Sequence, residues 1–191
     1  MVNTIADKRK AILKTALTLF TERGFHNTPT SLIAKEAGVA TGTLFHHFKN
    51  KEILINELYL HIKKEMLDVL IDESNKIPAI DKKLELVWMN SVKWGIMHPK
   101  ESLFFQQFAS SPFISNLTRE QAASQFEFIF DLIDEAVENE ILKPMSREFI
   151  SAYFEGMVFT TIQYLRKFPN NISEENLRKI FDVYKNGIAL K

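Results

Sequence analysis

Small and polar residues between Ser31 and Phe48 are spaced for the recognition of nucleic acid rather than for catalysis. Ala34 and Gly38 lie four residues apart, so they share one helical face, where small side chains let a second helix cross closely. Gly38 also tolerates the left-handed conformation of a tight turn. The buried contacts between the two helices are expected from Ile33, Ala37, Val39 and Leu44. This pattern predicts a helix-turn-helix, whose second helix can enter the major groove of DNA. The alternative is a helical hairpin within an ordinary bundle.

The chain has few residues that are suited to catalysis or to metal binding. There is no cysteine, and the six glycines form no phosphate-binding loop. His46 and His47 are adjacent, so on a helix their side chains point about 100° apart and make a poor pair of metal ligands. The acidic residues Asp131, Asp134, Glu135 and Glu138 are spaced as one solvated helix face. We therefore expect a protein that is not an enzyme and that needs neither a metal nor a cofactor.

Helical periodicity runs through nearly the whole sequence. A first helix is expected over about 5–23, with Thr4 and Asp7 as its N-terminal capping pair and Gly24 at its end. A second helix is expected to use Thr28 as N-cap and Pro29 as its first residue, and to end at Gly38. A third helix is expected from about 41 to 48.

Longer helices are expected after this three-helix segment. Their ranges are about 51–73, 81–98, 101–110, 119–140, 146–168 and 173–190, and prolines fall between several of them. The predicted fold is all-α, with about nine helices. An N-terminal three-helix DNA-binding head with a helix-turn-helix, residues 1–52, precedes a larger helical body for ligand binding and dimerisation, residues 53–191.

The charged residues are also distributed unevenly between these two segments. Residues 1–52 hold eight Lys and Arg but four Asp and Glu, so this segment carries a net charge of +4, and the remaining residues of the neutral chain carry −4. A basic head on an acidic body suggests an anionic partner for the head. No apolar run is long enough for a transmembrane helix, and the polar N-terminus does not look like a signal peptide, so we expect a cytoplasmic protein.

The helix-turn-helix segment resembles the TetR family of bacterial transcriptional regulators. The matching positions are Ile33-Ala34, Ala37-Gly38-Val39 and residues 42–52, which read GTLFHHFKNKE. The earlier Ile12-Leu13, Ala16, Leu19-Phe20 and Gly24-Phe25 match that family's first helix. The resemblance spans about residues 9–58. It implies a dimeric regulator, usually a repressor, that a small ligand releases from its operator.

The resemblance also implies which residues contact DNA. These are Thr30, Ser31, Thr41, Gly42, Thr43, Phe45, His46, His47 and Lys51. Side chains at the start of the third helix are expected to face base edges or phosphates, Gly42 to let the backbone approach DNA, and Lys51 to meet a phosphate. For each of these residues the alternative is a solvated polar side chain or a helix cap.

Two residues depart from the family pattern. Phe45 stands where the family usually has tyrosine, so a hydroxyl that commonly meets a phosphate is absent. Ala40 stands where serine is frequent, which removes a helix cap worth about 1 kcal/mol in many hosts.

The body is rich in large apolar side chains that suit a hydrophobic or aromatic ligand. The candidate pocket residues are Trp88, Trp94, Met97, Phe104, Phe105, Phe108, Phe126, Phe130, Phe154 and Met157. Each of them could instead be ordinary core. The last two helices carry apolar stripes and resemble the family's dimerisation elements.

These features together predict a ligand-responsive transcriptional regulator. We expect a repressor that binds a palindromic, double-stranded DNA operator as a homodimer, without a membrane partner, and that a small and mostly apolar effector releases. The alternative is a constitutive DNA-binding or adaptor protein that has no small-molecule effector.

Overall fold

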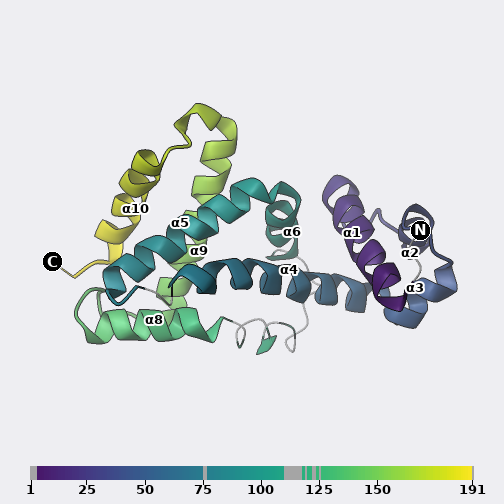
Figure 1. Cartoon of the computed structure of the whole chain (residues 1–191), viewed down its shortest axis with the longest axis horizontal. Coiled ribbons are helices and arrows are strands. Elements are labelled where there is room, and N and C mark those ends of the chain that lie inside the picture. The colour runs from purple at the N-terminus through teal and green to yellow at the C-terminus, as the bar shows by residue number, and fades with distance from the viewer. Residues whose placement is uncertain are drawn as a thin grey trace. The chain divides into compact units, whose positions relative to one another are not determined.

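The computed structural model of the chain describes residues 4–74, 77–109, 118, 120, 121, 124 and 126–190. Its helices are α1 (Ile5–Arg23), α2 (Thr30–Glu36), α3 (Thr41–His47), α4 (Lys51–Ser74), α5 (Ile80–Met97), α6 (Pro99–Ala109), α8 (Glu127–Glu138), α9 (Arg147–Lys167), the 3-10 turn η1 (Pro169–Asn171) and α10 (Glu174–Ile188) (Figure 1). Over these residues the strand-like pairing is one isolated bridge between Leu142 and Ala189. The predicted all-α fold is confirmed.

The chain divides into two compact units. Unit 1 comprises Met1–Lys63 and His98–Ala122, and unit 2 comprises Lys64–Met97 and Ala123–Lys191. Unit 1 therefore contains α6 as well as the three N-terminal helices. The domain boundary expected at residue 52 stays a prediction. Helix α4 begins at Lys51 and runs through this position without a break.

Both ends of α1 follow from the sequence. The hydroxyl of Thr4 accepts a hydrogen bond from the backbone N–H of Asp7, and the carboxylate of Asp7 accepts one from the N–H of Thr4, each at 3.1 Å. This reciprocal capping box is the predicted one. At the other end, Gly24 adopts a φ of +76°, which costs glycine little, and the helix stops there.

The predicted start of the second helix is wrong by one residue. Pro29 is the N-cap of α2, and the helix begins at Thr30. Thr28 does not cap α2, because its fully buried hydroxyl donates instead to carbonyl oxygens of the preceding segment, those of Gly24 at 2.8 Å and Leu19 at 3.2 Å. The hydroxyl of Thr28 thereby ties the segment before α2 to the end of α1 and to its C-cap.

A glycine turn joins α2 to α3. Gly38 adopts a φ of +68°, as its predicted role in the turn requires. The N–H of Gly38 donates to the carbonyl of Lys35 at 3.1 Å, and that of Val39 donates to Ala34 at 3.0 Å. Ile33, Ala34 and Leu44 are buried where α2 and α3 pack together. The chain therefore folds into the predicted helix-turn-helix.

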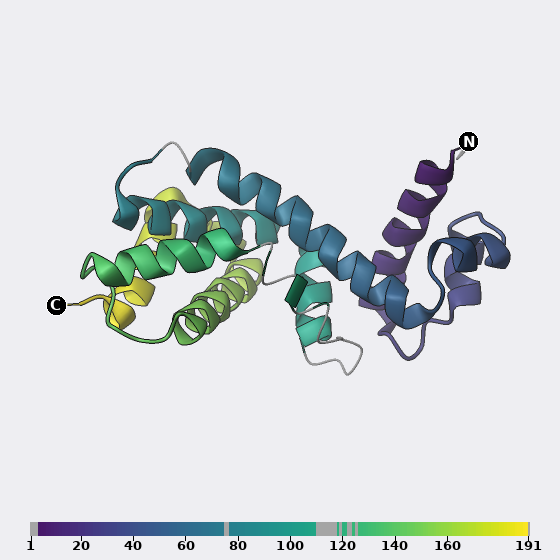
Figure 2. The same ribbon diagram turned by 90° about the horizontal axis from the view of Figure 1, so that it is seen from below.

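Unit 2 has its own apolar core, formed chiefly by α5, α8, α9 and α10 (Figure 2). Trp88 of α5 and Leu165 of α9 are fully buried in it. The predicted starts of the last two helices are confirmed, because the hydroxyls of Ser146 and Ser173 cap α9 and α10. Arg119, where another helix was expected to begin, lies outside the described residues, and α8 covers the later part of that range.

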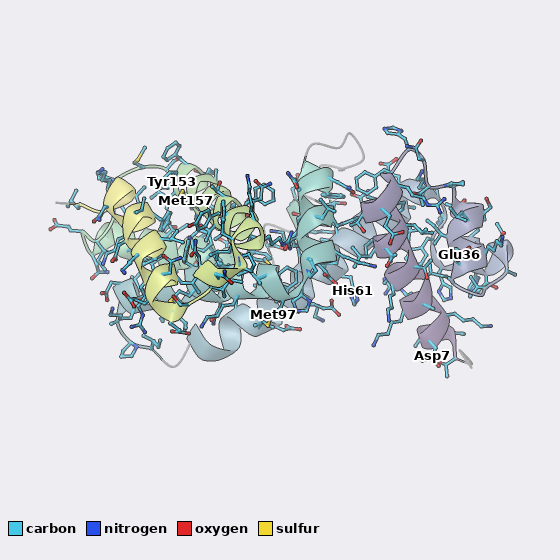
Figure 3. All side chains as sticks on the ribbon, turned by 90° about the horizontal axis from the view of Figure 1, so that it is seen from above. Asp7, Glu36, His61, Met97, Tyr153 and Met157 are labelled. Atoms are coloured by element: carbon cyan, nitrogen blue, oxygen red, sulfur yellow. The ribbon has the colours of Figure 1, made fainter. Side chains whose placement is uncertain are left out.

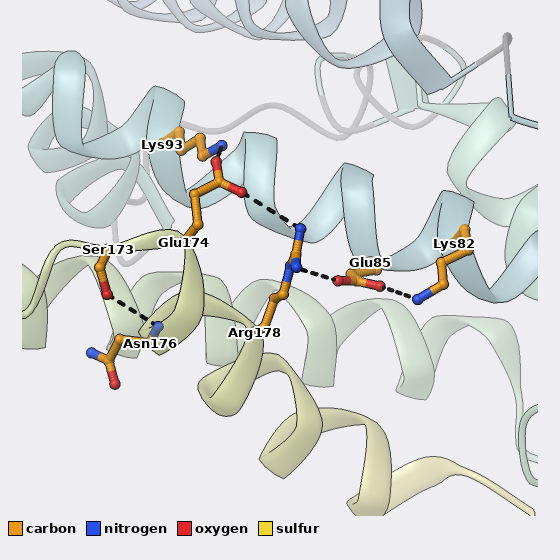
Figure 4. A network of polar contacts seen from close by, with 7 residues as sticks. All are labelled: Lys82, Glu85, Lys93, Ser173, Glu174, Asn176 and Arg178. Atoms are coloured by element: carbon orange, nitrogen blue, oxygen red, sulfur yellow. Dashed lines mark hydrogen bonds and ion pairs between the residues drawn. The ribbon is translucent and has the colours of Figure 1, made fainter.

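Ion pairs connect α10 to α5 at the surface of unit 2 (Figure 4). Glu174 pairs with Lys93, and Arg178 contacts Glu174 at 3.8 Å and Glu85 at 3.5 Å. Lys82 completes the network with a 2.9 Å contact to Glu85. Exposed ion pairs contribute little individually, so this network orients α10 more than it stabilises the core.

Replacing Thr28 with valine tests the role of its buried hydroxyl. Valine has nearly the same shape but leaves the two carbonyl oxygens without this donor, so we expect Thr28→Val to lower the free energy of unfolding by about 1–3 kcal/mol. Urea denaturation of the full chain measures the change. Thr41→Val, at an exposed position, is the matched control, and an equal effect of the two substitutions would contradict this role of Thr28.

Candidate nucleic-acid interface

The recognition helix α3 is held in place by two fully buried side chains. Leu44 and Phe48 have no exposed surface. The guanidinium of Arg9 lies over the Phe48 ring, 5.5 Å from its centroid, and donates to the carboxylate of Glu57 at 2.7 Å. Side chains from α1 and α4 therefore brace the C-terminal end of α3.

The other sides of α3 remain accessible. Thr41, Gly42 and His46 are exposed, Thr43 is half-buried, and the ring of Phe45 is 42% exposed. Ala40 is the N-cap and offers no side-chain oxygen to the first N–H groups of the helix, as the sequence predicts. Helix α3 thus presents hydroxyl groups near its start and an imidazole group near its end, both of which can hydrogen-bond to base edges and phosphates.

Two further predicted contacts lie on the first turn of α2. Ser31 is exposed and Thr30 is half-buried. Because α2 and α3 pack against each other through Ile33, Ala34 and Leu44, the structure brings these hydroxyls into the same three-helix segment as α3.

His47 is less open than His46. Its ring lies 5.7 Å from that of His46 and 6.1 Å from that of Phe48, measured between centroids. Burial lowers the pKa of His47, and the nearby His46, Arg9 and Lys8 lower it further, while Glu57 opposes them. The imidazole of His47 is therefore mainly neutral at pH 7, so it suits hydrogen bonding better than charge pairing.

Lys51 has a structural partner that the sequence does not reveal. Its ammonium group donates to the backbone carbonyl of Phe25, and burial lowers the pKa of this group. The contact joins the start of α4 to the turn after α1. The expected contact between Lys51 and a phosphate stays a prediction.

Helix α6 packs against α1 in unit 1. The ammonium of Lys100 donates to the hydroxyl of Thr18 at 3.0 Å, and the amide of Gln107 donates to the carbonyl of Thr21 at 3.4 Å. The rings of Phe104 and Phe25 meet edge to face, 5.7 Å apart. Sequence reasoning missed these contacts. The apolar spacing of Phe104 and Phe108 indicates a buried face but not the helix that covers it.

The ten candidate pocket residues fall into both units. Phe104, Phe105 and Phe108 belong to unit 1. There the ring of Tyr59 stacks on Phe108 with centroids 4.1 Å apart and meets Phe105 edge to face at 5.6 Å. These three phenylalanines therefore contribute to the packing of the unit that carries the head.

The other seven belong to unit 2 and differ in burial. Trp88, Trp94 and Phe154 are buried in its core, whereas Met97 is 67% exposed. The remaining three, Phe126, Phe130 and Met157, are half-buried. The structure thus brings part of the predicted set together around α5 and α9, and its role in ligand binding stays a prediction.

Neither a metal-binding cluster nor a membrane-spanning helix occurs in the described part of the chain. No group of three or more His, Asp or Glu side chains is placed there to hold a metal ion. None of the described helices combines the length and the apolar character needed to cross a membrane.

Comparison with known proteins identifies relatives of the same architecture. Residues 12–58 match the family described as bacterial regulatory proteins, tetR family. A Shewanella sp. PV-4 protein assigned to the TetR family of transcription regulators has a solved structure that is 33% identical in sequence. The alignment covers 96% of this chain and 99% of that one, with a TM-score of 0.91.

Two more distant relatives cover nearly the whole chain. YhgD, an uncharacterised helix-turn-helix regulator of Bacillus subtilis strain 168, is 22% identical over 93% of this chain and 94% of its own. The Bacillus subtilis regulator FadR, solved in complex with stearoyl-CoA, is 19% identical over 92% of this chain and 95% of its own, with a TM-score of 0.71. The likeness to FadR establishes a shared fold.

A bulky residue at position 42 tests whether DNA approaches the backbone of α3. Apart from its chain neighbours and its own helix backbone, a Cβ added to Gly42 would meet no atom of the described residues within 4 Å, so Gly42→Leu should leave the fold intact. We expect it to abolish specific DNA binding because its side chain occupies the space of the DNA. Gel-shift titration and thermal unfolding measure the two effects. Gln106→Leu, at an exposed position on α6, is the control, and undiminished DNA binding by Gly42→Leu would refute the interface.

Proposed function

The chain belongs to the TetR family of bacterial transcriptional regulators, and we propose that it is a dimeric repressor released from a palindromic operator by a small, mostly apolar effector. The observation that carries the proposal is the exposed start of α3 on a braced helix-turn-helix. Residues 1–52, which contain it, have a net charge of +4. This charge attracts the phosphate backbone, while the polar side chains of α3 supply the base contacts.

The proposal divides the contacts between the two helices of the turn, whose polar side chains are exposed or half-buried. Thr43 and His46 read base edges, while Thr41, Ser31 and Thr30 position the head on phosphates. Phe45, which lacks the hydroxyl of a tyrosine, provides apolar contact to the sugar-phosphate backbone or to a thymine methyl group.

Loss of the two reading side chains tests this division. Binding sites are first selected from random and genomic DNA with the full chain, and affinities are then measured at several salt concentrations. We expect a palindromic site with a Kd of about 10⁻⁸–10⁻¹¹ M. Thr43→Ala combined with His46→Ala should cost about 1–3 kcal/mol per lost contact and abolish discrimination, while non-specific, salt-sensitive binding persists.

A matched control removes the same residue types elsewhere. Thr15→Ala with His61→Ala alters α1 and α4 outside the turn and the recognition helix. The control variant should retain discrimination. Selection that enriches no sequence, or a reading-helix variant that discriminates as well as the wild type, would overturn the proposed reading helix.

The proposed dimer uses a free face of α9. Ala152, Gly156 and Thr160 are exposed and spaced four residues apart, opposite the side on which Phe154 and Leu165 are buried. On α10, the other helix expected in the interface, the apolar side chain of Val183 is 66% exposed. A small-residue stripe together with this exposed apolar side chain supports close packing of a second copy about a two-fold axis.

Gly156→Leu tests this surface without disturbing the core. A Cβ at Gly156 would meet nothing within 4 Å in the protomer, so the variant should keep its helical content. We expect it to shift the full chain from dimer to monomer in sedimentation equilibrium and to weaken operator binding, because two half-sites are no longer engaged together. Glu155→Leu, on the adjacent exposed residue, is the control. A fully dimeric Gly156→Leu variant would contradict the use of this face.

The effector signal has a proposed route to the head. The last residue of α5, Met97, and the first residue of α6, Pro99, are separated by His98 alone. Because Lys100 and Gln107 bind α6 to α1, and Phe104 contacts the following turn at Phe25, a shift of α5 is relayed through α6 as well as along α4. A change in head position then lowers operator affinity, provided that ligand and DNA favour different states.

The apolar class of effector is supported by the aromatic body and by the stearoyl-CoA found with FadR, a protein of the same fold. Release of the selected DNA in a screen of apolar small molecules is the direct test. A constitutive regulator, the alternative, would keep its operator affinity with every compound that binds the body.

A further inference from the structure

A buried hydrogen-bond donor in unit 2 has no acceptor among the residues that the structure describes. The side chain of Trp88 is fully buried, and its Nε1–H has no hydrogen-bond partner within that part of the chain. Leaving such a donor unsatisfied costs about 1–3 kcal/mol, and buried tryptophans usually find an acceptor. A phenylalanine would fill most of this space without that cost, so the indole N–H needs an explanation.

The surroundings of Trp88 are aromatic and adaptable. The ring of Phe181 from α10 lies 5.6 Å from that of Trp88, with the ring planes inclined by 51°. Met89 of α5 and Met157 of α9 belong to the same cluster, and Figure 3 labels Met157 beside Tyr153. Methionine side chains change rotamer at little cost, so this core can rearrange around an inserted molecule.

A series of rings connects this core with the surface. Phe149 is 50% exposed, and its ring is parallel to that of Tyr153 within 2°, at 6.5 Å between centroids. Tyr153 stacks on Tyr184 at 5.4 Å, and Tyr184 lies 5.7 Å from Phe181, the neighbour of Trp88. Flat apolar surfaces are thus present from the edge of α9 to the unpaired donor.

We propose that Trp88 is the polar anchor of the effector site and that the effector is a flat aromatic molecule bearing a carbonyl group. The carbonyl oxygen accepts the hydrogen bond from Nε1–H, and the ring packs among Phe181, Tyr184 and Met157. This inference rests on the proposed function, because it identifies the chemistry of the ligand in the same body. A carboxylate is disfavoured, since one neutral donor does not compensate a buried charge.

Two probes of equal shape test the hydrogen bond. Acetophenone carries a carbonyl oxygen where isopropenylbenzene carries a methylene group. Each is titrated into the full-length protein with ¹⁵N-labelled tryptophan and ¹³C-labelled methionine methyl groups. The two indole N–H signals are distinguished with Trp94→Phe, which removes the other one. We expect acetophenone to move the Trp88 signal downfield and to bind roughly tenfold more tightly than isopropenylbenzene, the effect of one buried hydrogen bond.

Trp88→Phe provides the matching variant. It should bind both probes with equal affinity, whereas Trp94→Phe should keep the preference for acetophenone. Should Trp88→Phe fail to fold, the indole signal of the wild type still decides the question. A Trp88 signal that acetophenone leaves unmoved, or equal affinities of the wild type for both probes, would overturn the proposal. If Nε1–H instead donates to the face of the Phe181 ring, the wild type will bind both probes with equal affinity.

The outcomes also separate this inference from the proposed function. If both probes shift the methionine signals equally, the body binds apolar ligands and only the role of Trp88 fails. If neither probe binds, the aromatic carbonyl class is refuted. Operator release by other apolar compounds, measured independently, then decides whether an effector exists.

Discussion

The DNA-binding head depends on the turn between α1 and α2, residues 24–29, which contacts α1, α4 and α6 and leads into α2. The ring of Phe25 contacts Phe20 of α1 and Phe104 of α6, while its carbonyl accepts a hydrogen bond from Lys51 at the start of α4. The hydroxyl of Thr28 satisfies carbonyls at the end of α1 just before α2 begins. Apolar packing supplies most of the energy here, and the hydrogen bonds fix the directions in which the helices leave the turn. A recognition helix can read base edges only if neighbouring residues hold it in a fixed direction, as these contacts do.

The interactions that hold the body together differ from those of the turn in the head. Its core is apolar and rich in aromatic rings, and surface ion pairs orient α10 on α5 without contributing much stability. A core of this kind tolerates rearrangement better than a hydrogen-bonded one. This difference suits the proposed function, in which the head holds its geometry on DNA while the body responds to an effector. Helices α4 and α6 are the elements that connect the two requirements, since α4 runs through both units and α6 follows α5 directly.

The sequence was sufficient for the features that local physics determines. Capping residues such as Thr4 and Ser146, and the positive φ of Gly24 and Gly38, follow from residue type alone, and the helix-turn-helix follows from its spacing. Interactions between segments far apart in the chain could not be predicted from the sequence. Thr28 was expected to be an N-cap because spacing does not reveal its competing acceptors, Leu19 on α1 and Gly24 at its C-cap. The structural partner of Lys51 could not be predicted because it is a backbone carbonyl 26 residues earlier. The spacing of Phe104 and Phe108 identifies a buried face without identifying what covers it, so the contact of Phe104 with Phe25 could not be predicted.

The central claim is that two copies of α3 read DNA as a symmetric pair. Hydroxyl-radical footprinting of the full chain on a selected site tests it most directly. We expect two protected regions related by two-fold symmetry, with adjacent major grooves about one helical turn apart. A single protected patch, or protection that spreads evenly along the DNA, would contradict it.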